Sequence, residues 1–413
     1  MIREHLWIVV LAILATSVAP SHGQELVLHE NDRVVFYGDS ITAQRLYTRF
    51  VEDFILTRYP QLRVTFWNAG VPGDTVYGGY TGDLPTRMKR DVFPHQPTVI
   101  TIMLGMNDGY YMAFDQKYLE VFKEGCRKLL DSIQTGAPAA RVTLISPTPY
   151  DEVTHGTEFA QYNDVVSRYS ATVKELATSS HLRFSDFNQV ETDLLNAGMR
   201  KNSSLAALLV PDRIHPADAS HWVMAAALAR SWGLSPVVSE LQLDVAAKKA
   251  VSTENTQIAD LEVGEAELHW TQTDDALPLP LSLDDGMIQF ALSVSDLAAI
   301  DQQLLLIKGL PAARYTLRID EKKIATFTRE QLSSGVNLAL YATPMESQAK
   351  GVDAIELKRM RLDEARFLLA IEGPTVANAA EATSAIEAKD AALAAEQRKL
   401  AQPKPHLFEL SPE

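Results

Sequence analysis

The chain has 413 residues, of which 38 are lysine or arginine and 53 are aspartate or glutamate, giving a formal net charge of −15. Hydrophobic residues make up 46% and charged residues 22%, ordinary globular values that exclude a mainly disordered or fibrous protein. The acidic balance argues against a nucleic-acid partner, because phosphates would repel it. The single cysteine, Cys126, excludes an intrachain disulfide and a cysteine-based metal site.

The N-terminus has the features of an export signal. Arg3 supplies a positive charge, and the apolar run over residues 6–19 has the length of a signal peptide but is shorter than a membrane span. Small residues at the −3 and −1 positions predict cleavage after Gly23. We expect residues 1–23 to be a signal peptide and the mature protein to be periplasmic or extracellular, with no membrane span after cleavage. The alternative is an uncleaved anchor helix.

Residues 24–233 alternate short apolar runs with longer helical patterns, and we interpret them as one domain. Helical spacing of apolar residues predicts helices over residues 44–59, 116–134, 158–178 and 217–231. Runs of β-branched and aromatic residues predict strands over residues 33–37, 63–67, 99–104, 142–146 and 182–184. This alternation indicates an α/β fold in which helices cover both faces of a parallel sheet.

The pattern changes after residue 233. We expect residues 234–375 to form an accessory β-rich region that begins with a connecting segment over residues 235–256 and ends in a helix over residues 344–370. Residues 376–413 are expected to be an Ala- and Glu-rich helical tail. Within the β-rich region, Asp320 and Glu321 are expected to form a hairpin turn. The predicted strands cover residues 258–270, 287–294, 303–307, 315–319 and 323–327.

Five residues that could take part in catalysis follow predicted strands or precede a predicted helix. Ser40 lies at the turn from the first strand into a helix, where its hydroxyl is exposed and its N–H favours negative charge. Gly70 ends the second strand and Asn107 follows the third, while Asp212 and His215 precede the last helix of the domain. Since the carboxyl ends of parallel strands form the site of an open sheet, we expect these residues to meet.

This ordered set resembles the SGNH hydrolases, also called the GDSL esterase/lipase family, over about residues 32–233. Ser40, Gly70, Asn107 and His215 match the four letters of the name in the right order. The resemblance implies a flavodoxin-like three-layer sheet, with Ser40 as nucleophile, His215 as general base and Asp212 orienting the imidazole. It also implies an oxyanion hole made by the N–H groups of Ser40 and Gly70 and by the Asn107 side chain.

The residue types agree with that chemistry on their own account. Acyl transfer needs a nucleophile, a base with a pKa near 7, an orienting carboxylate and donors for the oxyanion. Taken singly, Ser40 could cap a helix, Gly70 could serve a turn and His215 could be a surface residue. All of these structural interpretations would have to hold together for the site to be absent.

Three further aspartates, Asp39, Asp74 and Asp108, lie close enough in the motifs to support the site or to contact substrate. Asp212 and His215 could be mistaken for metal ligands, but no further histidine or cysteine joins them at ligand spacing. We therefore expect no metal and no cofactor.

We interpret the chain as an exported serine esterase that hydrolyses carboxylic esters through an acyl-enzyme. By analogy within the family, the ester is an acetyl group on a carbohydrate, either a small molecule or a polysaccharide. One alternative is a lipase or thioesterase acting on lipid or aryl esters, and another is a non-catalytic carbohydrate-binding protein on the same fold. The pattern predicts neither the oligomeric state nor the role of residues 234–413.

Overall fold

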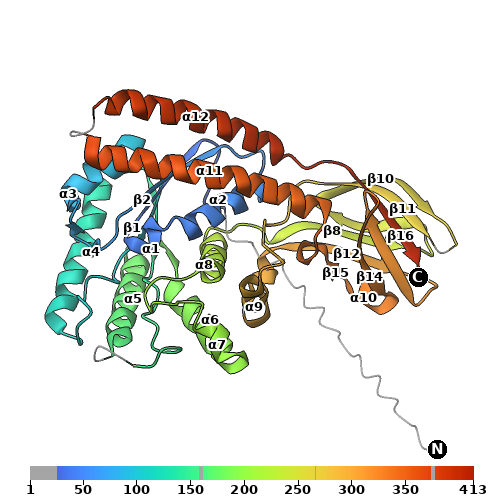
Figure 1. The fold of residues 1–413 in the computed structure, drawn as a ribbon, viewed down its shortest axis with the longest axis horizontal. Helices are drawn as coiled ribbons and strands as arrows, with labels where there is room; N and C mark the ends of the chain where they lie inside the picture. Colours follow the sequence, from blue (N-terminus) through green and yellow to red (C-terminus); the bar gives the residue numbers. More distant parts are fainter. Residues whose placement is uncertain (1–25, 158–160, 266, 374–376) are drawn as a thin grey trace, which may run out of the picture.

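The computed structural model describes residues 26–157, 161–265, 267–373 and 377–413, and Figure 1 shows their arrangement. The expected signal peptide, residues 1–23, lies outside the described residues. An α/β region comes first in the chain, and a β-rich region with two long helices follows it. Within the described ranges, no helix is long and apolar enough to cross a membrane.

The α/β region is built around a five-stranded parallel sheet in the order β2-β1-β5-β6-β7. This strand order is the flavodoxin-like one, so the expected fold class is confirmed. Each strand overlaps a predicted one, because each is an apolar run bounded by turn residues. The strands are β1 (Asp32–Gly38), β2 (Val64–Gly70), β5 (Val99–Met103), β6 (Arg141–Ile145) and β7 (Arg183–Ser185).

Helices cover both faces of this sheet (Figure 1). On one face Phe36 of β1 packs edge-on against Tyr47 of α2 and stacks on Trp232. On the other face Phe122 of α4 stacks on Tyr169 of α5. The helices are α1 (Ser40–Ala43), α2 (Leu46–Arg58), α3 (Leu84–Arg87), α4 (Gln116–Gly136), α5 (Tyr162–Ser179), α6 (Phe187–Lys201), α7 (Ser203–Ala206) and α8 (Asp218–Ser231). The short elements β3 (Gly78–Gly79), β4 (Gly82–Asp83), η1 (Met88–Val92) and η2 (Phe93–His95) lie between β2 and β5.

The β-rich region consists of two sheets in the orders β10-β11-β16-β13-β14 and β15-β12-β8-β9. Their apolar side chains form a second core that includes Trp270, Tyr315 and Phe408. Asp320 and Glu321 both have left-handed backbones, as a tight hairpin turn requires, so the turn predicted between β13 and β14 is confirmed. The strands are β8 (Val237–Asp244), β9 (Lys249–Glu254), β10 (Thr256–Val263), β11 (Leu268–Asp274), β12 (Gln302–Lys308), β13 (Arg314–Ile319), β14 (Lys322–Thr328), β15 (Val336–Asn337) and β16 (His406–Pro412).

Helices of the β-rich region connect its sheets to each other and to the α/β region. They are α9 (Gly286–Val294), η3 (Leu297–Ile300), α10 (Arg329–Ser334), η4 (Leu338–Leu340), α11 (Pro344–Glu372) and α12 (Ala379–Leu400). Ile288, Phe290 and Leu297 belong to the core of the α/β region. Helix α11 runs beside α2, with α12 packed along it (Figure 1). Residues 234–375 therefore contribute to both cores.

Four sequence-based assignments in this half are wrong. Residues 235–256 are the hairpin of β8 and β9 rather than a connector, and residues 258–270 belong to two antiparallel strands, β10 and β11. Residues 287–294 form α9, because Asp285 caps the helix and its apolar residues pack on the α/β core. The tail is not wholly helical, since β16 lies between β11 and β13.

A buried ion pair joins the two regions. Arg58, the last residue of α2, donates to Asp301 over 2.9 Å, and both side chains are almost fully buried. The second Asp301 oxygen accepts the Leu279 N–H at 2.9 Å. Burial raises the pKa of Asp301 to about 6, while the Arg58 charge acts to lower it. Both charges can be buried here because the attraction between them offsets the cost of removing each from water.

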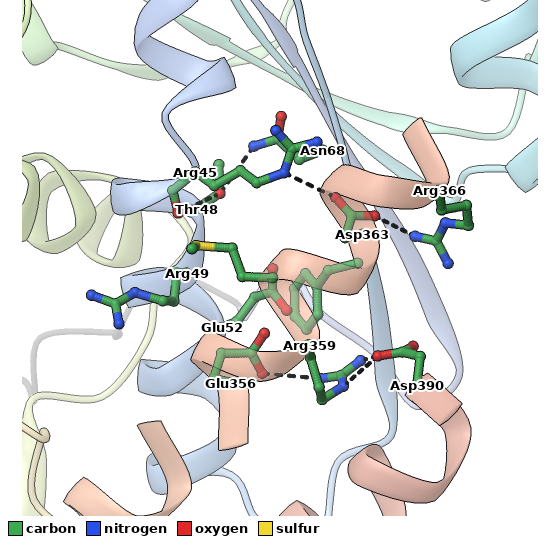
Figure 2. A pocket seen from close by; sticks show the side chains of 12 residues that line it. Arg45, Thr48, Arg49, Glu52, Asn68, Glu356, Arg359, Asp363, Arg366 and Asp390 are labelled. Carbon is green, nitrogen blue, oxygen red and sulfur yellow. Dashed lines mark hydrogen bonds and ion pairs between the residues drawn. The ribbon is translucent and has the colours of Figure 1, made fainter. Parts of the chain in front are cut away.

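A second polar contact joins α2 to the C-terminal helices. A cavity of about 20 Å³ lies between α2, α11 and α12, and ion pairs surround it (Figure 2). Burial and repulsion from Asp353 and Glu356 hold the pKa of Asp53, on α2, well above its ordinary range. Burial and repulsion from Glu356 do the same to the pKa of Glu52. The interface therefore retains protons that exposed carboxyl groups would release.

Asp301→Ala should lower the free energy of unfolding by about 3–5 kcal/mol, because it leaves the buried Arg58 charge uncompensated. The measurement is urea unfolding at neutral pH. Asp296→Ala is the matched control, since Asp296 forms an exposed pair with Arg230 in the same part of the chain. That variant should lose less than about 1 kcal/mol. Equal losses in the two variants would contradict the assignment of Arg58–Asp301 as the junction.

The contribution of Asp53 to the free energy of unfolding should fall as the pH rises above about 4. An unfolded aspartate releases its proton near pH 4, whereas folded Asp53 keeps its proton to a higher pH. In that window the unfolded state binds fewer protons, so the free energy of unfolding decreases with pH. Asp53→Asn should weaken this dependence in unfolding series between pH 4 and 8. Asp284→Asn, which alters a 91% exposed carboxylate, should leave it unchanged; an unaltered slope in Asp53→Asn would refute the prediction.

Candidate active site

Ser40 begins the four-residue helix α1 directly after β1. Asp39 caps this helix, since its side chain accepts the Ile41 N–H at 3.0 Å. As the first amide of α1, the Ser40 N–H has no acceptor within the helix and is available to developing negative charge. The chain therefore presents a half-buried hydroxyl beside a free amide at the carboxyl end of β1.

Ser40, His215 and Asp212 lie in a hydrogen-bonded line. The Ser40 Oγ is 2.9 Å from His215 Nε2, and His215 Nδ1 is 2.7 Å from Asp212 Oδ2. The other Asp212 oxygen accepts the N–H groups of His215 at 2.7 Å and Ile214 at 3.0 Å. Partial burial acts to raise the pKa of Asp212, but these hydrogen bonds outweigh it and the net shift is downward. The structure thus brings the three predicted residues together.

Gly70 touches the backbone of α1. A Cβ at this position would lie 2.3 Å from Ala43 N and 2.7 Å from Thr42 C, so only glycine fits. The Gly70 N–H donates to the Asn68 side chain at 3.0 Å, and the Asn68 amide donates to the Thr42 carbonyl at 2.8 Å. Gly70 is therefore next to the nucleophile helix, but its N–H already has an acceptor. It could serve an oxyanion only by sharing its hydrogen.

Asn107 is held from two sides. Its Nδ2 donates to the Asp74 carbonyl at 3.0 Å, which leaves the second amide hydrogen available. Its Oδ1 accepts the Tyr111 hydroxyl at 3.0 Å. That bond fixes the amide so that nitrogen rather than oxygen can face a developing anion. The sequence analysis did not identify Tyr111, and only its place four residues after Asn107 could have suggested it.

The three additional aspartates are buried and hold the backbone around the site. The Asp108 side chain accepts the Val76 N–H at 3.0 Å, as Asp39 does for Ile41. Burial raises the pKa of Asp39 and of Asp108 to about 7, against the lowering effect of these hydrogen bonds. Burial also raises the pKa of Asp74, which an arginine partly offsets. These contacts favour the supporting role predicted for them over substrate contact.

Arg87 is a further residue that the sequence analysis missed. Its fully buried guanidinium donates to Asp74 Oδ2 at 2.8 Å and to the Ala69 carbonyl at 2.6 Å, and it pairs with Asp91. It therefore ties the end of β2 to the loop that receives the Asn107 amide. A single arginine in a mixed segment carries no local signal for such a role.

In the described ranges, no group of three or more histidine, cysteine, aspartate or glutamate side chains is arranged to hold a metal ion. Asp212 and His215 instead bond to one another and to Ser40.

Comparisons with known proteins agree with this geometry. Residues 36–223 match the GDSL-like Lipase/Acylhydrolase family. An acetylxylan esterase from Geobacillus stearothermophilus is 26% identical over 229 residues, which cover 50% of this chain and 97% of that protein.

One solved structure extends the likeness in fold over most of the chain. A gut microbial diltiazem-metabolizing enzyme has a TM-score of 0.81 at 23% identity, covering 94% of this chain and 98% of that one. An acetylxylan esterase from Geobacillus stearothermophilus has a TM-score of 0.41 at 23% identity, covering 50% and 97%. The first likeness shows that the two regions occur together in another protein. Residues 36–223 of this chain therefore form a GDSL-like lipase/acylhydrolase domain, the domain of an ester hydrolase.

Proposed function

We propose that the protein is an exported serine esterase that removes acetyl groups from carbohydrates. The observation that carries the proposal is the hydrogen-bonded line from Ser40 through His215 to Asp212 within the GDSL-like domain. A hydroxyl, an imidazole and a carboxylate in this order are the parts needed for acyl transfer.

The reaction proceeds in two halves. His215 Nε2 takes the proton from Ser40 Oγ as that oxygen bonds to the ester carbonyl carbon. The tetrahedral intermediate collapses, the sugar oxygen leaves with the proton from His215, and the acetyl group stays on Ser40. Water then attacks the acyl-enzyme, giving its proton to His215, and acetic acid departs as Ser40 recovers its hydrogen. The Asp212 carboxylate stabilises the imidazolium in both halves.

The oxyanion of each intermediate receives its main hydrogen bonds from the Ser40 N–H and the free Asn107 amide hydrogen. Gly70, predicted as a third donor, contributes only as far as its N–H can be shared with Asn68. We assign Tyr111 as a positioning residue, because its hydroxyl holds the Asn107 amide in the donating orientation.

The carbohydrate part of the proposal has two supports. A relative at 26% identity is an acetylxylan esterase. In addition, Tyr110 follows in the Asn107 loop with 59% of its surface exposed, and its ring lies 5.4 Å from that of Tyr118. An exposed ring in the loop of Asn107 provides an amphipathic surface for a sugar ring.

Export is proposed from the first residues of the sequence. Arg3 and the apolar run over residues 6–19 form the charged and hydrophobic parts of a signal peptide. Acetylated polysaccharides are polymers outside the cytoplasm, and an exported enzyme reaches them directly.

Ser40→Ala should lower kcat on 4-nitrophenyl acetate and on acetylated xylo-oligosaccharides by about 10⁶-fold, because the nucleophile is lost. Acid release and labelling by an organophosphonate are the measurements. Ser203→Ala, on the exposed helix α7, is the control and should retain both. Hydrolysis by Ser40→Ala at the wild-type rate would end the proposed mechanism.

The substrate panel separates the alternatives in the same experiment. Activity confined to long-chain aryl esters would favour a lipase over a carbohydrate deacetylase. Binding of acetylated xylan without acid release by the wild type would indicate a non-catalytic carbohydrate-binding protein.

Asn107→Ala should lower kcat by about 10²–10³-fold with little change in KM, because one oxyanion donor is removed. Tyr111→Phe should lower kcat by about tenfold, because it removes the one hydrogen bond that orients the Asn107 amide. In an Asn107→Ala background, Tyr111→Phe should have no further effect on kcat. Independent, multiplicative losses in the double variant would show that Tyr111 does not act through Asn107.

A further inference from the structure

Arg45 connects the nucleophile helix to the C-terminal half of the chain. It stands two residues after α1 and adopts a left-handed backbone, with φ of 62° at the start of α2. The left-handed conformation is unfavourable for a residue that has a Cβ, so contacts with the surrounding structure must hold the Arg45 backbone in it. Only 5% of Arg45 is exposed, and a charge buried to that extent requires a partner.

One partner of Arg45 is close in the sequence, and the others lie on the C-terminal helix α11. Its Nη1 donates to the carbonyl of Ala43, the last residue of α1, at 3.0 Å. Its Nε lies 3.3 Å from Asp363 Oδ2 on α11, and its guanidinium is 5.7 Å from the Phe367 ring centre. Asp363 also pairs with Arg366 on the same helix (Figure 2). Helix α11 thus supplies a countercharge and an aromatic face to a residue that holds α1.

Movement of Ala43 would be passed on to Ser40. The Ala43 N–H donates to the Asp39 carbonyl at 2.9 Å, so one helical turn spans the nucleophile. Ala43 N is also the atom against which Gly70 packs. Because α1 has only four residues, its C-terminal carbonyl and its N-terminal serine cannot be displaced independently.

We propose that Asp363 is a positioning residue for Ser40 and that it acts through Arg45. The inference rests on the proposed function of Ser40 and assigns the C-terminal helix α11 to the active unit of the esterase. Loss of the Asp363 charge releases Arg45, which lets its left-handed backbone relax and shifts the carbonyl end of α1.

A general contribution to packing is the competing explanation, and α2 and α11 offer a matched control for it. Arg49 donates to Asp353 at 2.9 Å across the same two helices. Arg49 lies within α2, and among the described residues its side chain contacts Asp353 and the Phe50 ring rather than α1. Asp353→Asn therefore removes an interhelical ion pair of the same kind without touching the nucleophile helix.

The test compares Asp363→Asn with Asp353→Asn in the full chain, using 4-nitrophenyl acetate. Asp363→Asn should lower kcat by about ten- to a hundredfold with KM within about twofold of the wild type, since small misplacements of reacting groups have effects of this size. The rate of Ser40 labelling by an organophosphonate should fall in parallel. Asp353→Asn should leave kcat and labelling unchanged, whatever it does to the melting temperature.

A double-mutant cycle completes the test. In an Arg45→Ala background, Asp363→Asn should produce no further loss of kcat. Asp363→Glu, which retains the charge, should recover kcat relative to Asp363→Asn. If Asp363→Asn does not fold, Asp363→Ser, which also removes the charge, takes its place in the cycle. Wild-type kcat and labelling in Asp363→Asn, a loss no larger than that of Asp353→Asn, or multiplicative losses in the cycle would each overturn the inference. A wild-type protein that neither hydrolyses esters nor labels at Ser40 would instead overturn the proposed function.

Discussion

The site depends on one close contact, the packing of α1 on the backbone of Gly70. Because no side chain intervenes, the nucleophile turn and the end of β2 form a single surface. Asn68 reinforces that surface by bonding to both sides of it. The loop that follows Gly70 then carries Asp74, whose carbonyl holds Asn107. A side chain at position 70 would therefore disturb the nucleophile and the oxyanion donors together, rather than one of them.

Buried charge organises the rest of the molecule around this contact. Arg87 holds the end of β2 from below, Arg58 joins α2 to the β-rich region, and Arg45 joins α1 to α11. Each guanidinium bonds to a carboxylate from another segment, so each meets its countercharge only in the complete fold. Arg45–Asp363, together with Arg49–Asp353, attaches helix α11 to the α/β region at two points.

The sequence predicted those features of the structure that depend on neighbouring residues in the chain. The strands of the α/β sheet are apolar runs, and Ser40, Asn107 and His215 follow or precede elements whose ends the sequence marks. Helix α9 was mistaken for a strand because it is apolar on most sides, which occurs when a short helix is packed between other elements. Contacts such as Arg45–Asp363, between residues 318 positions apart, leave no trace in either segment. Tyr111 belongs to the same class, because its role is defined by the atom that it touches.

Strand β16 has a consequence for the order in which the protein can form. It pairs with β11 on one side and β13 on the other, and Asp320 at the β13–β14 turn bonds to the Leu407 N–H at its beginning. All five strands of the parallel sheet lie at or before Ser185, so they can associate before the rest of the chain has emerged. The antiparallel sheet has to wait for residues 406–412, and until they arrive β11 and β13 present open edges to other chains. Nascent β-rich segments of this protein are therefore the part with the greatest need for protection by chaperones.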